Sequence, residues 1–205
     1  MSWGAVRPSS LELVGRRVAL RPLVPGDFEQ WREVRTRSRD WLVRWEPKPL
    51  VGQPDAAEDR RVFAARCAAR DRERQLGTGY GFGIFVGGRF AGEINISSIQ
   101  RGPFQNAYVG YWIDQAMAGQ GYVPESATLV IRFAFEELAL HRIQVAIIPR
   151  NRASRRVAEK LGLREEGVAY RYLEINGVWE DHVRYAITAE EWWQRREEFT
   201  ATWLA

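Results

Sequence analysis

The sequence contains few of the residues that build metal centres and disulfide frameworks. Its 205 residues include one cysteine, Cys67, and two histidines, His141 and His182. A single cysteine cannot form an internal disulfide, and no Cys/His cluster has the spacing of a zinc site. Cys67 lies in an Ala/Arg-rich helical pattern, so we interpret it as a packing residue rather than a nucleophile. We therefore expect no metal site.

Long apolar runs are also lacking. No stretch approaches the roughly 18 to 20 apolar residues that span a bilayer, and residues 1–10 lack the charged-then-apolar pattern of a secretory signal. The net charge of +4, from 30 basic and 26 acidic residues, is mild, and no RNA-binding motif accompanies it. We expect a cytoplasmic protein that neither enters membranes nor reads nucleic-acid sequence directly.

The residues that are present suit one mixed α/β domain. A hydrophobic content of 45% in 205 residues is enough for one full core and short for two. Hydrophobic periodicity predicts strands at 18–21, 81–86, 89–98, 108–113, 142–148, 163–172 and 178–187. Helices are predicted from Asp27, over 55–74, 124–140 and 151–161, and after Thr188. Because a helix crosses between strands 108–113 and 142–148, these two strands are expected to be parallel.

Several short signals fix the ends of these elements. Gly87-Gly88 and Asn176-Gly177 predict two-residue hairpin turns. Asp27 with Gln30, and Thr188 with Glu191, predict helix N-caps. A proline-rich connector, residues 41–54, separates the first two helices.

The most informative segment is a strand, a glycine turn and a helix start over residues 108–127. Gly119 and Gly121 allow a sharp turn in which several N–H groups converge at the positive end of the next helix, where a phosphate is favoured. Simple structural turns use glycine in the same way, so this pattern alone leaves both readings open. The dinucleotide fingerprint and the P-loop are absent, since Tyr122 and Val123 follow Gly121 where a P-loop has Lys and Ser/Thr.

A second informative segment begins the helix at Asn151. Asn151 is a good N-cap, and Val157, Ala158 and Leu161 form a packing face. Ser154 precedes these three positions by three, four and seven residues, so its hydroxyl shares the inward face of the helix. It either bonds the backbone or lines a site.

Together these segments resemble the GNAT superfamily of acetyl-CoA-dependent N-acetyltransferases, and within it the RimJ/RimL group that acetylates ribosomal-protein amino termini. The resemblance rests on the glycine turn, Asn-x-x-Ser at 151–154 and Glu-Lys-Leu-Gly at 159–162, and covers about residues 16–190. It implies one acetyltransferase domain over 1–205, ending in a helix over 189–203. The implied fold is a mostly antiparallel sheet with a splayed central parallel pair, flanked by helices. Ala118 and Val123 depart from the family's loop pattern.

The resemblance also implies acetyl-CoA as the acetyl donor and assigns roles to particular residues. The strand before the loop is expected to pair with the pantetheine arm, and Ser154 to protonate the departing thiolate. Arginines 150, 152, 155 and 156 could meet the adenosine phosphates. The implied cofactor-binding residues are Trp112, Ile113, Gly119, Gln120, Gly121, Tyr122, Val123, Asn151 and Arg156.

For the acceptor amine, the candidate general base is Glu93. Strand alternation places Glu93, Asn95 and Ser97 on one face, which either meets solvent or lines the acceptor cleft. The expected acceptor-binding residues are Trp41, Asn95 and Tyr170, although core packing is the default interpretation of each aromatic residue.

The acceptor expected from the resemblance is a protein N-terminal α-amine, such as that of a ribosomal protein. Deprotonation at pH 7 costs about 1.4 kcal/mol for an α-amine and roughly 4.6 for lysine, so an α-amine needs only a modest base. Two alternatives stay open: a small amine such as a polyamine or antibiotic, and a non-catalytic CoA-binding or ribosome-associated factor. A monomer and a homodimer are both compatible with the sequence.

Overall fold

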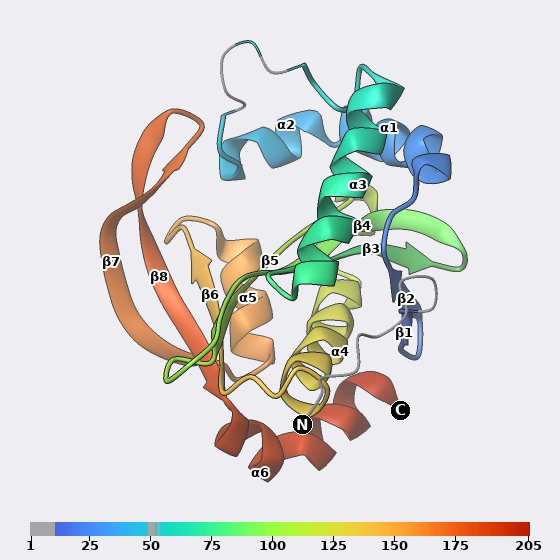
Figure 1. Ribbon diagram of the computed structural model, residues 1–205. Helices are drawn as coiled ribbons and strands as arrows, with labels where there is room; N and C mark the ends of the chain where they lie inside the picture. The colour runs from blue at the N-terminus through green and yellow to red at the C-terminus, as the bar shows by residue number, and fades with distance from the viewer. Residues whose placement is uncertain (1–10, 49–51, 53) are drawn as a thin grey trace.

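An eight-stranded sheet with helices on both faces forms the centre of the computed structural model (Figure 1), which describes residues 11–48, 52 and 54–205. The strands are β1 (Leu13–Val14), β2 (Val18–Arg21), β3 (Tyr80–Val86), β4 (Arg89–Gln100), β5 (Asn106–Ile113), β6 (Arg142–Ile147), β7 (Arg164–Ile175) and β8 (Val178–Thr188). The helices are α1 (Phe28–Arg37), α2 (Arg39–Leu42), α3 (Arg60–Leu76), α4 (Tyr122–Glu136), α5 (Arg152–Lys160) and α6 (Ala189–Phe199), which continues into a π-helical turn at Thr200–Leu204.

The strand order is β1-β2-β3-β4-β5-β6-β8-β7, and the only parallel neighbours among the described strands are β5 and β6. Their pairing is short. It includes Asn106 with Arg142 and ends at Tyr108 with Gln144, whereas β5 stays paired with β4 as far as Ile113. Beyond this point β5 and β6 diverge, so the predicted splayed parallel pair is confirmed.

Two hydrophobic clusters lie on opposite faces of the sheet. The larger cluster joins the sheet to α4, α5 and α6, and the apolar stripe predicted for α4 is buried in it. The smaller cluster joins the other face to α1 and α3, where the rings of Trp31 and Phe63 lie 4.9 Å apart. Cys67 is buried in this smaller cluster, which confirms that it is a packing residue.

The predicted local signals are mostly confirmed. Gly87 and Gly88 have φ of 55° and 76°, and Asn176 and Gly177 have φ of 47° and 83°, as two-residue hairpin turns require. Thr188 and Glu191 form the predicted capping box of α6.

Asp27 is the N-cap residue of α1, as predicted, but its side chain does not form the predicted cap. Both of its carboxylate oxygens accept hydrogen bonds from Arg21, and one also accepts from the N–H of Val24. Gln30, the expected partner, instead accepts from the N–H of Phe90. Donors outside α1 therefore engage both side chains in place of the predicted capping box.

Two helix ends differ from the prediction. The second helix begins at Arg60 rather than residue 55, because Asp59 caps it by accepting from the N–H of Arg61. Helix α4 ends at Glu136 rather than residue 140, and Ala139 then takes φ of 49°. Residues 1–10 and part of the predicted connector lie outside the described residues. No described helix is long and apolar enough to cross a membrane.

Candidate active site

A cleft of about 760 Å³ opens where β5 and β6 diverge. Its walls come from residues 110–113 of β5, the loop and helix start over 117–124, one face of α5, and the segment 41–47. Asn95 of β4 adds a polar side chain. Three parts of the chain that are far apart in the sequence, 41–47, 110–124 and 151–160, therefore meet at the break in the sheet.

The glycine loop has the geometry of an anion cradle. Gly119 and Gly121 have φ of 79° and 88°, a conformation that disfavours any side chain. Within the described part of the chain, the N–H groups of residues 119–123 donate to no backbone acceptor. They lie at the N-terminus of α4, whose dipole adds positive potential.

Arg17 and Glu125 hold this loop in place through hydrogen bonds. The Arg17 guanidinium donates to the carbonyl of Gln120 at 2.9 Å and to the carboxylate of Glu125 at 2.9 Å. It also lies 5.0 Å from the ring centroid of Tyr122. Glu125 is fully buried and accepts from the backbone N–H of Arg17 and Val18 at 2.6 and 3.1 Å. The loop is thereby tied to the start of β2, a contact that no sequence motif indicated.

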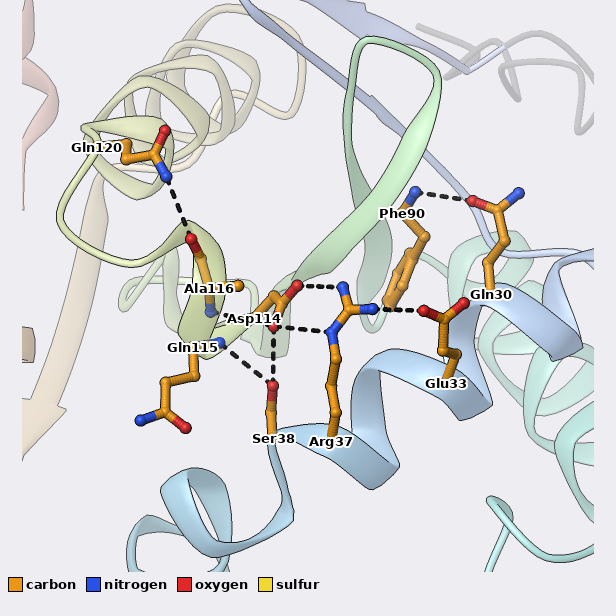
Figure 2. A network of polar contacts seen from close by, with 9 residues as sticks. All are labelled: Gln30, Glu33, Arg37, Ser38, Phe90, Asp114, Gln115, Ala116 and Gln120. Carbon is orange, nitrogen blue, oxygen red and sulfur yellow. Dashed lines mark hydrogen bonds and ion pairs between the residues drawn. The ribbon is translucent and has the colours of Figure 1, made fainter.

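A second polar network holds the end of β5 (Figure 2). Asp114 is fully buried and accepts hydrogen bonds from Arg37, from Ser38 Oγ at 3.0 Å and from the N–H of Ala116 at 3.2 Å. Ser38 Oγ in turn accepts from the N–H of Gln115 at 3.2 Å. The junction of α1 and α2 is thus fixed to the strand that forms one wall of the cleft.

Burial alone would raise the pKa of the Asp114 carboxyl. The hydrogen bonds from Arg37, Ser38 and Ala116 outweigh burial and hold this pKa below its usual range. Asp114 is therefore ionised wherever the protein functions near neutral pH.

In the cleft, Tyr111 and Ser154 form a hydroxyl pair. Their oxygens are 2.9 Å apart, and the N–H of Ser154 donates to Asn151 Oδ1 at 3.1 Å, which confirms the predicted cap. Burial raises the pKa of Tyr111 to about 12, although the hydrogen bond with Ser154 opposes the rise. Tyr111 is therefore a neutral hydroxyl near pH 7, and either oxygen of the pair can donate the hydrogen bond between them.

Helix α5 presents a row of positive charge to the cleft. Arg152, Arg156 and Lys160 are four residues apart, which places them on one helix face, and all three line the cleft. Arg150 and Arg155, also expected near the phosphates, are instead engaged by Glu180 and by the hydroxyl of Tyr185. The sequence alone did not distinguish the basic residues that line the cleft from the arginines that are engaged elsewhere.

Most of the predicted site residues line the cleft. They are Trp41, Asn95, Trp112, Ile113, Gly119, Gly121, Tyr122, Val123, Asn151, Ser154 and Arg156. Sequence reasoning missed the part played by Tyr111, which alternation along β5 places on the opposite face from Trp112.

Glu93, Gln120 and Tyr170 do not line the cleft. Glu93 is 3% exposed and accepts from Trp31 Nε1 at 2.7 Å and from Arg66 at 2.5 Å, because α1 and α3 cover its part of β4. It is therefore shielded from solvent and does not line this cleft, unlike Asn95 two residues further along β4. The side-chain amide of Gln120 donates to the carbonyl of Ala116, and Tyr170 is 81% exposed on β7.

Known proteins share this architecture. A model of the acetyltransferase (GNAT) domain matches residues 17–164. The chain is 36% identical over 177 residues to the probable N-acetyltransferase YjcK of Bacillus subtilis, covering 85% of this chain and 96% of that protein. It is 31% identical over 170 residues to the [ribosomal protein uS5]-alanine N-acetyltransferase of Escherichia coli, covering 81% and 86%.

The same relationship is seen among solved structures. Mycobacterium smegmatis RimJ in complex with CoA-disulfide superposes with a TM-score of 0.81 at 32% identity, covering 90% of this chain and 88% of that one. The chain is thus an N-acetyltransferase that belongs to the GNAT family.

Proposed function

We propose that this cleft transfers the acetyl group of acetyl-CoA to a primary amine, and that the acceptor is the N-terminal α-amine of a protein. The observation that carries the proposal is the coincidence of three features at the break between β5 and β6. These features are the glycine cradle, the row of cations on α5 and the hydroxyl pair of Tyr111 and Ser154.

The residues present fit acetyl-CoA. The N–H groups of residues 119–123 would hold the diphosphate, and Arg152, Arg156 and Lys160 would neutralise phosphate charge. On the side of β5 that faces β6, Trp112 and Ile113 lie beyond the last residue that pairs with β6. Their backbone groups can therefore pair with the amides of the pantetheine arm, as an added strand would. The departures at Ala118 and Val123 leave this cradle intact because it is made of backbone.

Acetyl-CoA supplies an activated thioester carbonyl, and the chain's own groups manage the protons. When the amine nitrogen bonds to the carbonyl carbon and the carbon–sulfur bond breaks, the sulfur needs a proton. Ser154 Oγ can donate it and take a proton from the Tyr111 hydroxyl, 2.9 Å away, and the proton that the amine nitrogen loses can return to the Tyr111 oxygen through water, so that both hydroxyls are restored. Asn151 fixes the serine by accepting from its backbone N–H.

The role of Glu93 as general base stays a prediction. Because Arg66 and Trp31 hold its carboxylate behind the cleft, a proton from the acceptor would have to reach it through water. A Glu93→Gln variant with an unchanged pH profile of turnover would reject this role.

The comparison with the E. coli enzyme favours a protein acceptor, since that relative is named for an alanine of ribosomal protein uS5. An α-amine is also the protein amine that is cheapest to deprotonate at neutral pH, by about 3 kcal/mol relative to lysine.

The test measures thiol release from acetyl-CoA with purified protein and three acceptors. These are a peptide with a free N-terminal alanine, the same peptide with a blocked N-terminus and an internal lysine, and a polyamine. Turnover confined to the first acceptor supports the proposal. Turnover only with the polyamine would replace the proposed acceptor by a small amine, and binding of CoA without any turnover would overturn catalysis.

A further inference from the structure

The acidic and the basic side chains that line the cleft lie on different segments of the chain. Among the described residues that line it, Glu46 has the only carboxylate, whereas Arg152, Arg156 and Lys160 follow α5. Arg150, just before α5, lies with its guanidinium 5.5 Å from the ring centroid of Trp45, so the segment 41–47 sits beside the N-terminal end of that helix. The basic side chains of α5 are complementary in charge to an anionic cofactor. The Glu46 carboxylate therefore has no role in the proposed cofactor site.

Glu46 is held in place before any ligand arrives. Arg35 donates to both of its carboxylate oxygens, at 2.6 and 2.8 Å, and the N–H of Asn176 donates to its backbone carbonyl at 2.9 Å. Its side chain nevertheless stays 29% exposed. Each carboxylate oxygen has two lone pairs, so the pair with Arg35 leaves Glu46 able to accept further hydrogen bonds.

Three tryptophans, Trp41, Trp45 and Trp112, line the same cleft as this carboxylate. The guanidinium of Arg35 lies 5.0 Å from the ring centroid of Trp112, and that of Arg150 lies 5.5 Å from the ring centroid of Trp45. Because arginines already lie over these two rings, the Glu46 carboxylate is the charged hydrogen-bond acceptor that the cleft offers to a further cation. An anionic or purely apolar acceptor group would gain nothing from it. The composition of this region is therefore that of a site for a cation.

We propose that Glu46, in a cleft that tryptophans also line, binds a positively charged group of the acceptor and makes the enzyme prefer cationic acceptors. This inference rests on the proposed function, because it assigns the substrate preference of the same cleft. The charged group is either the reacting amine in its ammonium form or a second basic group on the acceptor. Arg35 offsets part of the Glu46 charge, so we expect an effect of about tenfold on acceptor binding, which corresponds to one charged hydrogen bond.

The experiment compares wild-type protein with Glu46→Gln in steady-state kinetics. Two peptides share an N-terminal alanine and differ only in carrying lysine or glutamine at the third residue. We expect the variant to raise KM for the acceptor about tenfold, with kcat and the KM for acetyl-CoA unchanged. A rise for both peptides identifies the reacting ammonium as the bound group, and a rise for the lysine peptide alone identifies the second basic group.

A matched control separates recognition from stability. Glu180→Gln removes a nearby carboxylate that pairs with Arg150 and does not line the cleft, so it should leave acceptor KM unchanged. An unchanged acceptor KM in Glu46→Gln would overturn the inference. So would a joint rise of the KM values for acceptor and acetyl-CoA with a lowered Tm, which would show that the Arg35 pair only holds the fold. Wild-type protein that turns over neither peptide would contradict the proposed function instead.

Discussion

Replacing Asp114 by asparagine tests whether the network behind β5 stabilises the wall of the cleft. The substitution keeps the size of the side chain but removes its charge. Ser38 Oγ and the N–H of Ala116 can still donate to the remaining oxygen, whereas Arg37 then faces an amide that cannot serve as a charged acceptor. The main loss is therefore the charge-assisted contact with Arg37.

The expected loss is about 2 to 3 kcal/mol of unfolding free energy. A hydrogen bond to a charged group contributes about 1.5 to 3 kcal/mol, and breaking a fully buried ion pair costs about 3 to 5. The Arg37 side chain is 37% exposed, so water compensates part of the change and the lower range applies. For a chain of this length, each kcal/mol lowers Tm by about 2 to 4 °C, which gives a shift of about 4 to 12 °C.

The assay is thermal unfolding at several pH values, with Glu29→Gln as the control because its ion pair with Arg60 is exposed on both sides. The pKa of Asp114 is lowered in the folded state, so its stabilisation is fully present above the unfolded pKa near 4 and disappears as pH falls through the folded pKa. The difference between wild type and variant should thus be constant above about pH 5 and shrink in acid. A Tm shift no larger than that of Glu29→Gln at pH 7 would refute the reasoning.

Three further predictions concern the cleft and the core. Tyr111→Phe keeps the ring but removes the hydroxyl that supports Ser154, so kcat should fall about 10- to 100-fold at saturating substrates; an unchanged kcat would remove Tyr111 from the proton path. Gly121→Ala forces a side chain into φ of 88° with its Cβ 3.1 Å from the Arg17 guanidinium, a strain of about 1 to 2 kcal/mol, so the KM for acetyl-CoA should rise while the acceptor KM stays constant. Burial raises the pKa of Cys67 to about 11, so the native protein should resist a thiol reagent at pH 8 and the unfolded protein should react; rapid labelling of native protein would contradict the burial.

The features that the sequence predicted correctly are those decided within a few residues. The Asn176-Gly177 turn and the cap of Asn151 on Ser154 each depend on backbone conformation and on partners at most three positions away. The parallel pair followed from connection rules, which constrain topology without any side-chain detail.

The features that were missed depend on partners outside the local motif. Asp27 has the local pattern of a cap, but Arg21 supplies two charge-assisted hydrogen bonds that a cap cannot match. The alternation of β4 gave the correct face for Glu93, yet only the packing of α1 and α3 decides what covers that face. Tyr111 meets Ser154 across 43 positions, which neither periodicity nor motif spacing can indicate.

The short pairing between β5 and β6 has a consequence for thermal behaviour. Three residue pairs join the two halves of the sheet, and the gap beyond them is the place where the pantetheine arm is proposed to lie. A ligand bound there would connect the two halves of the sheet, because it would take the place of a strand between them. Saturation with CoA should then raise unfolding free energy by about 2.7 kcal/mol at a hundredfold excess over Kd, and this gain should be accompanied by slower amide exchange in both β5 and β6.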